Sequence, residues 1–116
     1  MSLMTKQITV TVTNISKTKD KKYIFETYEN ILNSILDFTS ITSNVSFEKD
    51  KDYFKIDFMM KISKTGDILW ILIKEFLSCI KETEDQAQIT IDEVEQNGIG
   101  MTYKLYRYTP CCHSIQ

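Results

Sequence analysis

Three residues near the end of the chain have side chains that could do chemistry. Cys111, Cys112 and His113 follow one another in TPCCHSIQ, and thiolates and imidazole are usual ligands of zinc. A structural zinc site normally takes four ligands with CxxC-like spacing, which this run does not provide. Pro110 cannot donate a hydrogen bond to a β-sheet, so it predicts the end of the last strand and a flexible tail over 111–116. We therefore assign no metal ligands and no cofactor.

The other reactive side chains do not form a catalytic set. His113 is the only histidine of the chain, and a flexible tail positions a general base poorly. Cys79 falls in a predicted helix close in phase to apolar residues, which predicts a small buried side chain. Asp92 and Glu93 lack the apolar surroundings of an acid catalyst, and no phosphate-binding loop or nucleophile elbow occurs. No catalytic residue is assigned, and an enzyme is kept only as an alternative.

The composition is that of one ordinary globular domain. The 116 residues carry 14 basic and 16 acidic side chains, a formal net charge of −2, so no broad positive field would attract a polyanion. The longest apolar run, 68–73, is far shorter than the ~20 residues that span a bilayer. Three cysteines indicate no disulfide framework. We expect a cytoplasmic, single-domain protein over 5–110, preceded by a leader over 1–4.

Residue periodicity predicts seven secondary-structure elements. Strict alternation in QITVTVT places Ile8, Val10 and Val12 on one face of a strand. Apolar residues spaced three and four apart predict two amphipathic helices, and Asn97-Gly98 is typical of a tight hairpin turn. Together the patterns predict helices over 23–39 and 68–82, and strands over 7–13, around Val45 and Phe47, and over 53–62, 87–96 and 99–108.

The order β-α-β-β-α-β-β predicts an α+β fold. Two right-handed crossovers flanking a hairpin give a ferredoxin-like two-layer sandwich, with two helices on one face of an antiparallel sheet ordered 4-1-3-2. The extra C-terminal strand would lie beside the fourth strand. This element order is shared by proteins of many functions, so it indicates no activity.

The sheet face opposite the helices is the predicted binding surface. Counting alternate residues along each strand assigns it polar and aromatic side chains, and such a face is solvated, paired with another subunit, or used to stack bases and ligands. The candidate binding residues on this open sheet face are Tyr53, Lys55, Met59, Lys104, Tyr106 and Tyr108.

Two strand sequences are similar to those of the RNA-recognition-motif family. VTVTNI at 10–15 resembles that family's first-strand signature, and KDYFKIDF at 51–58 resembles its third-strand signature. The resemblance implies RNA binding by aromatic stacking on the sheet. However, Thr11 and Lys55 stand where the family has aromatic rings, and Asp52 stands where it has glycine, so Tyr53 alone remains as a stacking platform.

These observations favour a binding or interaction module that forms a homodimer. Tyr and Met are enriched at protein interfaces, which favours the open sheet face. A second candidate interface lies on the very apolar second helix, at Trp70, Ile71 and Leu77. The alternatives are a weak nucleic-acid-binding domain that uses the open sheet face, and a small-ligand binder or enzyme with a pocket between sheet and helices. No membrane partner is expected.

Overall fold

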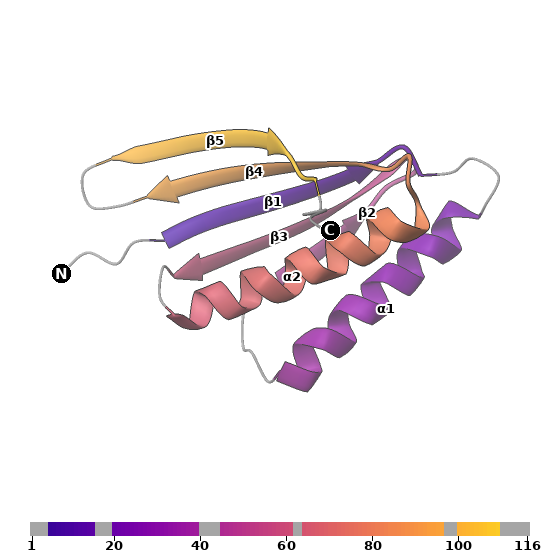
Figure 1. Cartoon of the computed structure of the whole chain (residues 1–116), viewed down its shortest axis with the longest axis horizontal. Helices are drawn as coiled ribbons and strands as arrows, with labels where there is room; N and C mark the ends of the chain where they lie inside the picture. The colour runs from indigo at the N-terminus through magenta and orange to yellow at the C-terminus, as the bar shows by residue number, and fades with distance from the viewer. Residues whose placement is uncertain (1–4, 16–19, 40–44, 62–63, 97–99, 110–116) are drawn as a thin grey trace, which may run out of the picture.

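A computed structural model describes residues 5–15, 20–39, 45–61, 64–96 and 100–109. It has two layers, with both helices on the same side of a twisted sheet (Figure 1). The expected leader over 1–4, the tail over 111–116 and the Asn97-Gly98 turn lie outside the described residues. The elements are β1 (Thr5–Thr13), α1 (Lys21–Thr39), β2 (Val45–Lys49), β3 (Tyr53–Lys61), α2 (Lys64–Thr83), β4 (Gln88–Gln96) and β5 (Met101–Arg107).

All strand pairs are antiparallel, and the described sheet has the order β2-β3-β1-β4-β5. Read from the β5 edge, this order is 5-4-1-3-2. β1 lies in the centre, where it pairs with β3 on one side and β4 on the other. The predicted α+β fold, with a five-stranded antiparallel sheet and two helices, is confirmed.

Alternation along β1 explains why it occupies the centre of the sheet. Ile8, Val10 and Val12 have no exposed surface, whereas Thr9 and Thr11 between them lie on the opposite face. A strand with one completely apolar face gains most from burial when it has neighbours on both sides and helices above it. This packing places Thr9 and Thr11 in the middle of the open sheet face.

An aromatic cluster joins the sheet to α1. The rings of Phe25 and Phe54 meet edge to face with centroids 5.0 Å apart, and Phe47 stacks on Phe54 at 5.1 Å. Tyr28 lies against the same ring at 5.6 Å. Such contacts stabilise a core by about 0.5–1.5 kcal/mol per pair beyond the area that they bury.

Local hydrogen bonds fix two points where the chain changes direction. Asp20 caps α1, because its Oδ1 accepts from the backbone N–H groups of Lys22 and Tyr23 at 3.1 and 3.4 Å. At the end of β1, Asn14 has a φ of 62°, a left-handed conformation that asparagine tolerates better than most residues. Its side-chain amide donates to the carbonyl of Gln86 at 2.8 Å, which ties this turn to the start of β4.

Candidate functional site

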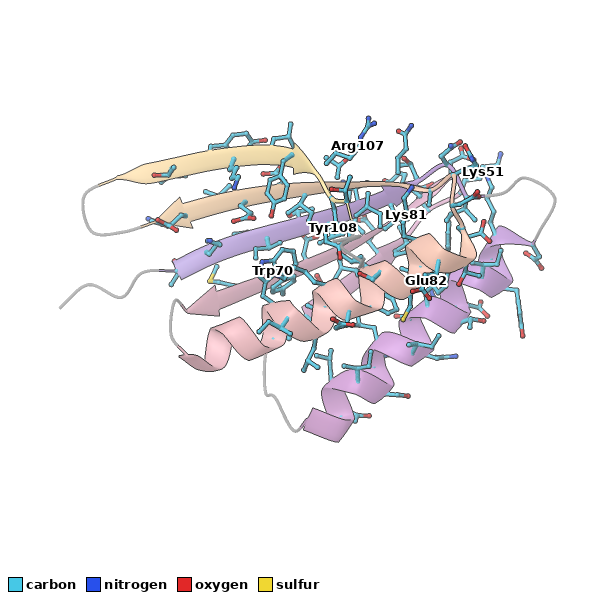
Figure 2. The ribbon with its side chains drawn as sticks, in the orientation of Figure 1. Lys51, Trp70, Lys81, Glu82, Arg107 and Tyr108 are labelled. Carbon is cyan, nitrogen blue, oxygen red and sulfur yellow. The ribbon has the colours of Figure 1, made fainter. Side chains whose placement is uncertain are left out.

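The open sheet face is polar through most of its length. Side chains of directly paired residues lie on the same face, so the pairings define rows that cross the sheet. One row runs from Asp57 on β3 through Thr9 on β1 and Asp92 on β4 to Leu105 on β5. The next row contains Lys55, Thr11, Thr90 and Arg107. In Figure 2, Arg107 lies on the side of the sheet away from the helices.

In the row that contains Asp57 and Asp92, which we call the central row, hydroxyl groups donate hydrogen bonds to both carboxylates. Thr9 donates a hydrogen bond to Asp57, and the hydroxyl of Tyr103 donates to Asp92 at 3.1 Å. The bond to Asp92, with partial burial and the carboxylate charge, raises the pKa of Tyr103. Within the described ranges, no group of three or more His, Cys, Asp or Glu side chains could hold a metal ion. The carboxylates of this row accept hydrogen bonds and do not provide a set of metal ligands.

At the other end of the face, Tyr53 and Lys55 form a small cation–π pair. The Nζ of Lys55 lies 5.4 Å from the centroid of the Tyr53 ring. A hydrogen bond with Asp50 and the charge of that carboxylate raise the pKa of Tyr53. Glu48 on β2 pairs directly with Lys55. The predicted stacking platform therefore lies among acidic neighbours.

Exposed apolar side chains on the same face lie on β5, at the free edge of the sheet, and on β3. Met101, Tyr103 and Leu105 on β5 are 69, 62 and 58% exposed, and Met59 on β3 is 54% exposed. Val94 on β4 pairs directly with Tyr103 and lies between the strands that carry the others. We call these five residues the β5 patch. It contains the four large apolar side chains of the described open face that are more than half exposed, together with the partly buried Val94.

The predicted position of Lys104, Tyr106 and Tyr108 on the open face is wrong. Tyr106 pairs directly with Ile91 and Lys104 with Glu93, and both partners are buried under the helices. The even-numbered residues of β5 therefore face the helix layer. The hydroxyl of Tyr108 lies 2.8 Å from the Oγ of Ser78 and donates to the carbonyl of Lys74 at 3.1 Å, so the ring is directed toward α2 (Figure 2).

A charged cluster lies on the helix side of β4 and β5. Glu93 is only 8% exposed and accepts a hydrogen bond from the hydroxyl of Tyr106, while the Nζ of Lys6 lies 3.1 Å from its other oxygen. Burial alone would raise the pKa of Glu93, but Tyr106, Lys6 and the charge of Lys104 together hold it below its ordinary value. Burial, and then the bond to Glu93, raise the pKa of Tyr106. Together these contacts attach β5 to the body of the sheet.

The second helix offers less interface than the sequence suggested. Leu77 is fully buried in the core, so its assignment to an interface is wrong. Trp70 packs against the core, with its ring 5.8 Å from that of Phe58 and the Nζ of Lys74 over its face at 5.4 Å. Ile71 is more than half exposed. Only Ile71 of the three candidates presents an open apolar side chain.

Cys79 is exposed, which corrects the prediction of a buried side chain. The buried stripe of α2 centres on Leu69, Ile73, Phe76 and Ile80. At about 100° of rotation per residue, Cys79 lies roughly 100° from the centre of that stripe. Its proximity in sequence to Phe76 and Ile80 was therefore misleading.

A groove lies in the helix layer, not between the sheet and the helices. Its volume is about 780 Å³, and all of its described lining residues belong to α1 and α2. The lining combines apolar side chains with uncharged hydroxyl and amide groups: Tyr23, Thr27, Asn30, Ile31, Ser34, Ile35 and Leu72. The alternative of a pocket between sheet and helices stays a prediction.

Sequence reasoning missed Met101, Tyr103 and Leu105 as surface residues. Their signal was nevertheless present, because they recur at every second position of β5. A two-residue turn at Asn97-Gly98 would already have placed even-numbered residues of the last strand opposite odd-numbered core residues of β4. The pairing rule, applied across the hairpin, would have found this face.

Comparison of the chain with family models, curated proteins and solved structures finds no match. Among the described helices, none combines the length and the apolar character that crossing a membrane requires.

Proposed function

We propose that this protein is a small cytoplasmic interaction module of ferredoxin-like architecture, which forms a homodimer through the β5 side of its open sheet face. The strand order supports the architecture, since β1 to β4 occupy the positions of a 4-1-3-2 sheet and β5 extends it beside β4. Three cysteines and no indicated disulfide framework support a reducing compartment.

The β5 patch is the observation that carries the proposal. Four of its side chains, Met59, Met101, Tyr103 and Leu105, are more than half exposed on one face. Contiguous exposed apolar side chains on a small protein mark contact surfaces, and Met and Tyr are enriched in protein interfaces. Gln7 lies between Met59 and Val94 in its row, so a polar side chain separates Met59 from the part of the patch on β4 and β5. The continuous part of the patch is formed by Met101, Tyr103 and Leu105 on β5, with Val94 beside Tyr103.

The same face is poorly suited to nucleic acid. Tyr53 and Lys55 lie on the open face, whereas Lys104 and Tyr106 lie on the helix side, so the aromatic and basic residues do not form one surface. The central row of the open face carries the carboxylates of Asp57 and Asp92. Phosphate contacts require a basic surface, so we favour a protein partner.

Sedimentation velocity on the wild-type chain and two matched variants tests the homodimer. Leu105→Glu places a charge in the β5 patch, and Ile71→Glu places the same charge on an equally exposed apolar residue of α2. We expect a dimer for the wild-type chain at roughly 50 μM, an affinity typical of a small interface. Leu105→Glu should be monomeric and Ile71→Glu should remain dimeric.

A dimeric Leu105→Glu variant and a monomeric Ile71→Glu variant would instead place the interface on the second helix. A wild-type chain that stays monomeric at all accessible concentrations would refute the proposed function. Circular dichroism on both variants should show that each charge leaves the fold intact, because both positions are exposed in the monomer.

A further inference from the structure

Half of the backbone hydrogen-bonding groups of β5 point away from the sheet. In the described structure β5 is an edge strand, with β4 as its neighbour. The N–H of Tyr108 donates to the carbonyl of Ile89 at 2.8 Å, which sets the alternation of the β4–β5 ladder. Even-numbered residues of β5 direct their N–H and C=O groups toward β4. The groups of Met101, Tyr103 and Leu105 are therefore directed to the free edge.

The same three residues carry the exposed apolar side chains of β5. Their side chains lie on the open face, while their backbone groups point along the plane of the sheet. A strand added at this edge would pair those backbone groups and cover part of the side chains at the same time. The occupant that fits is therefore an extended strand that presents apolar side chains on one face.

A second β5 is such a strand, and one register suits it. With a two-fold axis at Tyr103, the two Tyr103 residues face each other and each Met101 faces Leu105 of the second copy. On the helix side, Thr102 faces Lys104 of the second copy. The outward N–H and C=O groups of Met101, Tyr103 and Leu105 are then all hydrogen-bonded, and no like charges lie opposite each other.

Neighbouring registers are less favourable. An axis at Lys104 places the ammonium groups of the two Lys104 residues opposite each other. This is a non-hydrogen-bonded pair, in which side chains lie closest, so the like charges destabilise pairing. An axis at Leu105 moves Met101 opposite Thr109 and Tyr103 opposite Arg107, so the apolar residues no longer match. Of these three registers, the one centred on Tyr103 matches the apolar residues best and sets no like charges opposite each other.

We infer that the homodimer forms by antiparallel pairing of β5 with β5 of a second copy, about a two-fold axis at Tyr103, to give one continuous ten-stranded sheet. This inference rests on the proposed self-association and specifies its geometry. It also aligns the row Met59, Gln7, Val94, Tyr103 with its symmetry copy across the axis. Both helix layers then lie on the same side of the joined sheet.

Cross-linking with a short bifunctional thiol reagent tests the register. Tyr103→Cys and the control Arg107→Cys are made in a chain with Cys79, Cys111 and Cys112 replaced by serine. In the proposed dimer the Cα atoms at position 103 are about 5.5 Å apart, whereas those at position 107 are about 26 Å apart. We expect a covalent dimer for the first variant only. Preferential cross-linking at position 107 would overturn the register.

Amide hydrogen exchange on the unaltered chain supplies a second measurement that does not depend on a substitution. The N–H groups of Tyr103 and Leu105 should exchange rapidly in the monomer and at least tenfold more slowly under dimer-forming conditions. The inward N–H groups of Lys104 and Tyr106 should be protected at both concentrations. A dimer by sedimentation without added protection at Tyr103 and Leu105 would overturn edge pairing and leave self-association standing. A monomer throughout would overturn both proposals.

Discussion

Glu93 shows how a single carboxylate can be buried at low cost. Its oxygens face the hydroxyl of Tyr106 and the ammonium of Lys6, and the charge of Lys104 adds to the same effect. Burying a carboxylate is unfavourable unless such partners replace the lost water. The lowered pKa of Glu93 means that its contacts favour the charged form in the folded state. Ionisation of Glu93 therefore makes the fold more stable at neutral pH than at a pH where this carboxyl is protonated.

Replacement of Tyr106 with phenylalanine tests this cluster. The variant should lose about 1–2 kcal/mol of the free energy of unfolding at pH 7, because a hydrogen bond to a charged, buried group is removed. A folded pKa below the unfolded one gives stability that is present above the unfolded value and lost as pH falls through the folded value. The deficit of the variant should therefore shrink as pH falls through the lowered pKa of Glu93. Urea denaturation across this pH range measures it.

Tyr103→Phe is the matched control, since its hydroxyl bonds Asp92 on the open face rather than a buried carboxylate. We expect a loss below about 0.5 kcal/mol for this control, measured at a monomeric concentration. A deficit in Tyr106→Phe that stayed constant with pH would show that Glu93 does not depend on the hydroxyl.

At the scale of elements, the type and order of strands and helices were predictable from residue periodicity, whereas the face of β5 could be predicted only from the register of the hairpin. The alternation in β1 and the apolar spacing in both helices survive in the structure because one face of each element is buried. In β5 both faces carry large side chains, with Leu105 on one and Tyr106 on the other. Composition could not choose between them, and the hairpin register did.

In α2 as well, the sequence did not determine which side chains at the edge of the buried stripe are covered. Trp70 and Cys79 lie on opposite flanks of the buried stripe, where a small rotation of the helix decides whether a side chain is covered. Helical spacing gives the stripe but not its edges, because the edges depend on what the neighbouring elements cover. Trp70 packs on Phe58, and Cys79 is exposed.

Tyr108 connects two elements, and its hydroxyl can be removed alone. Tyr108→Phe keeps the ring but deletes the contacts with Ser78 and the carbonyl of Lys74 on α2. We expect a loss of about 1 kcal/mol in the free energy of unfolding. Exchange of the β5 amides should also become faster, because the end of that strand is held less firmly.

Tyr23→Phe serves as the comparison, because Tyr23 is among the most exposed aromatic residues of the described chain. It should leave both the free energy of unfolding and β5 exchange unchanged. If the two variants behaved alike, the contact between Tyr108 and α2 would contribute nothing to docking of β5.

At the scale of the whole molecule, the two layers have different roles. The helix layer covers one face of the sheet and, with it, forms a core that includes Phe25, Phe54 and Leu77. The opposite face carries threonines, charged side chains and the β5 patch. The fold is therefore stabilised on one side and is available for contact on the other.

Self-association should make the thermal stability of the wild-type chain depend on its concentration. A partner that binds only the folded state raises the melting temperature as concentration increases. For a weak dimer of this size we expect about 3 °C for each tenfold increase. Leu105→Glu should melt at a temperature that does not change with concentration. Differential scanning fluorimetry over two decades of concentration measures both, and equal slopes would contradict the role of the β5 patch.

The central position of β1 has a consequence for how the sheet forms. β2 and β3 are close in sequence, and so are β4 and β5, so each pair closes a short loop. β1 instead pairs with β3 and with β4, both of which lie far along the chain. Long loops cost more entropy to close, and folding slows as the mean sequence separation of contacts increases. The first strand of the chain is thus the piece that must join two locally formed hairpins into one sheet.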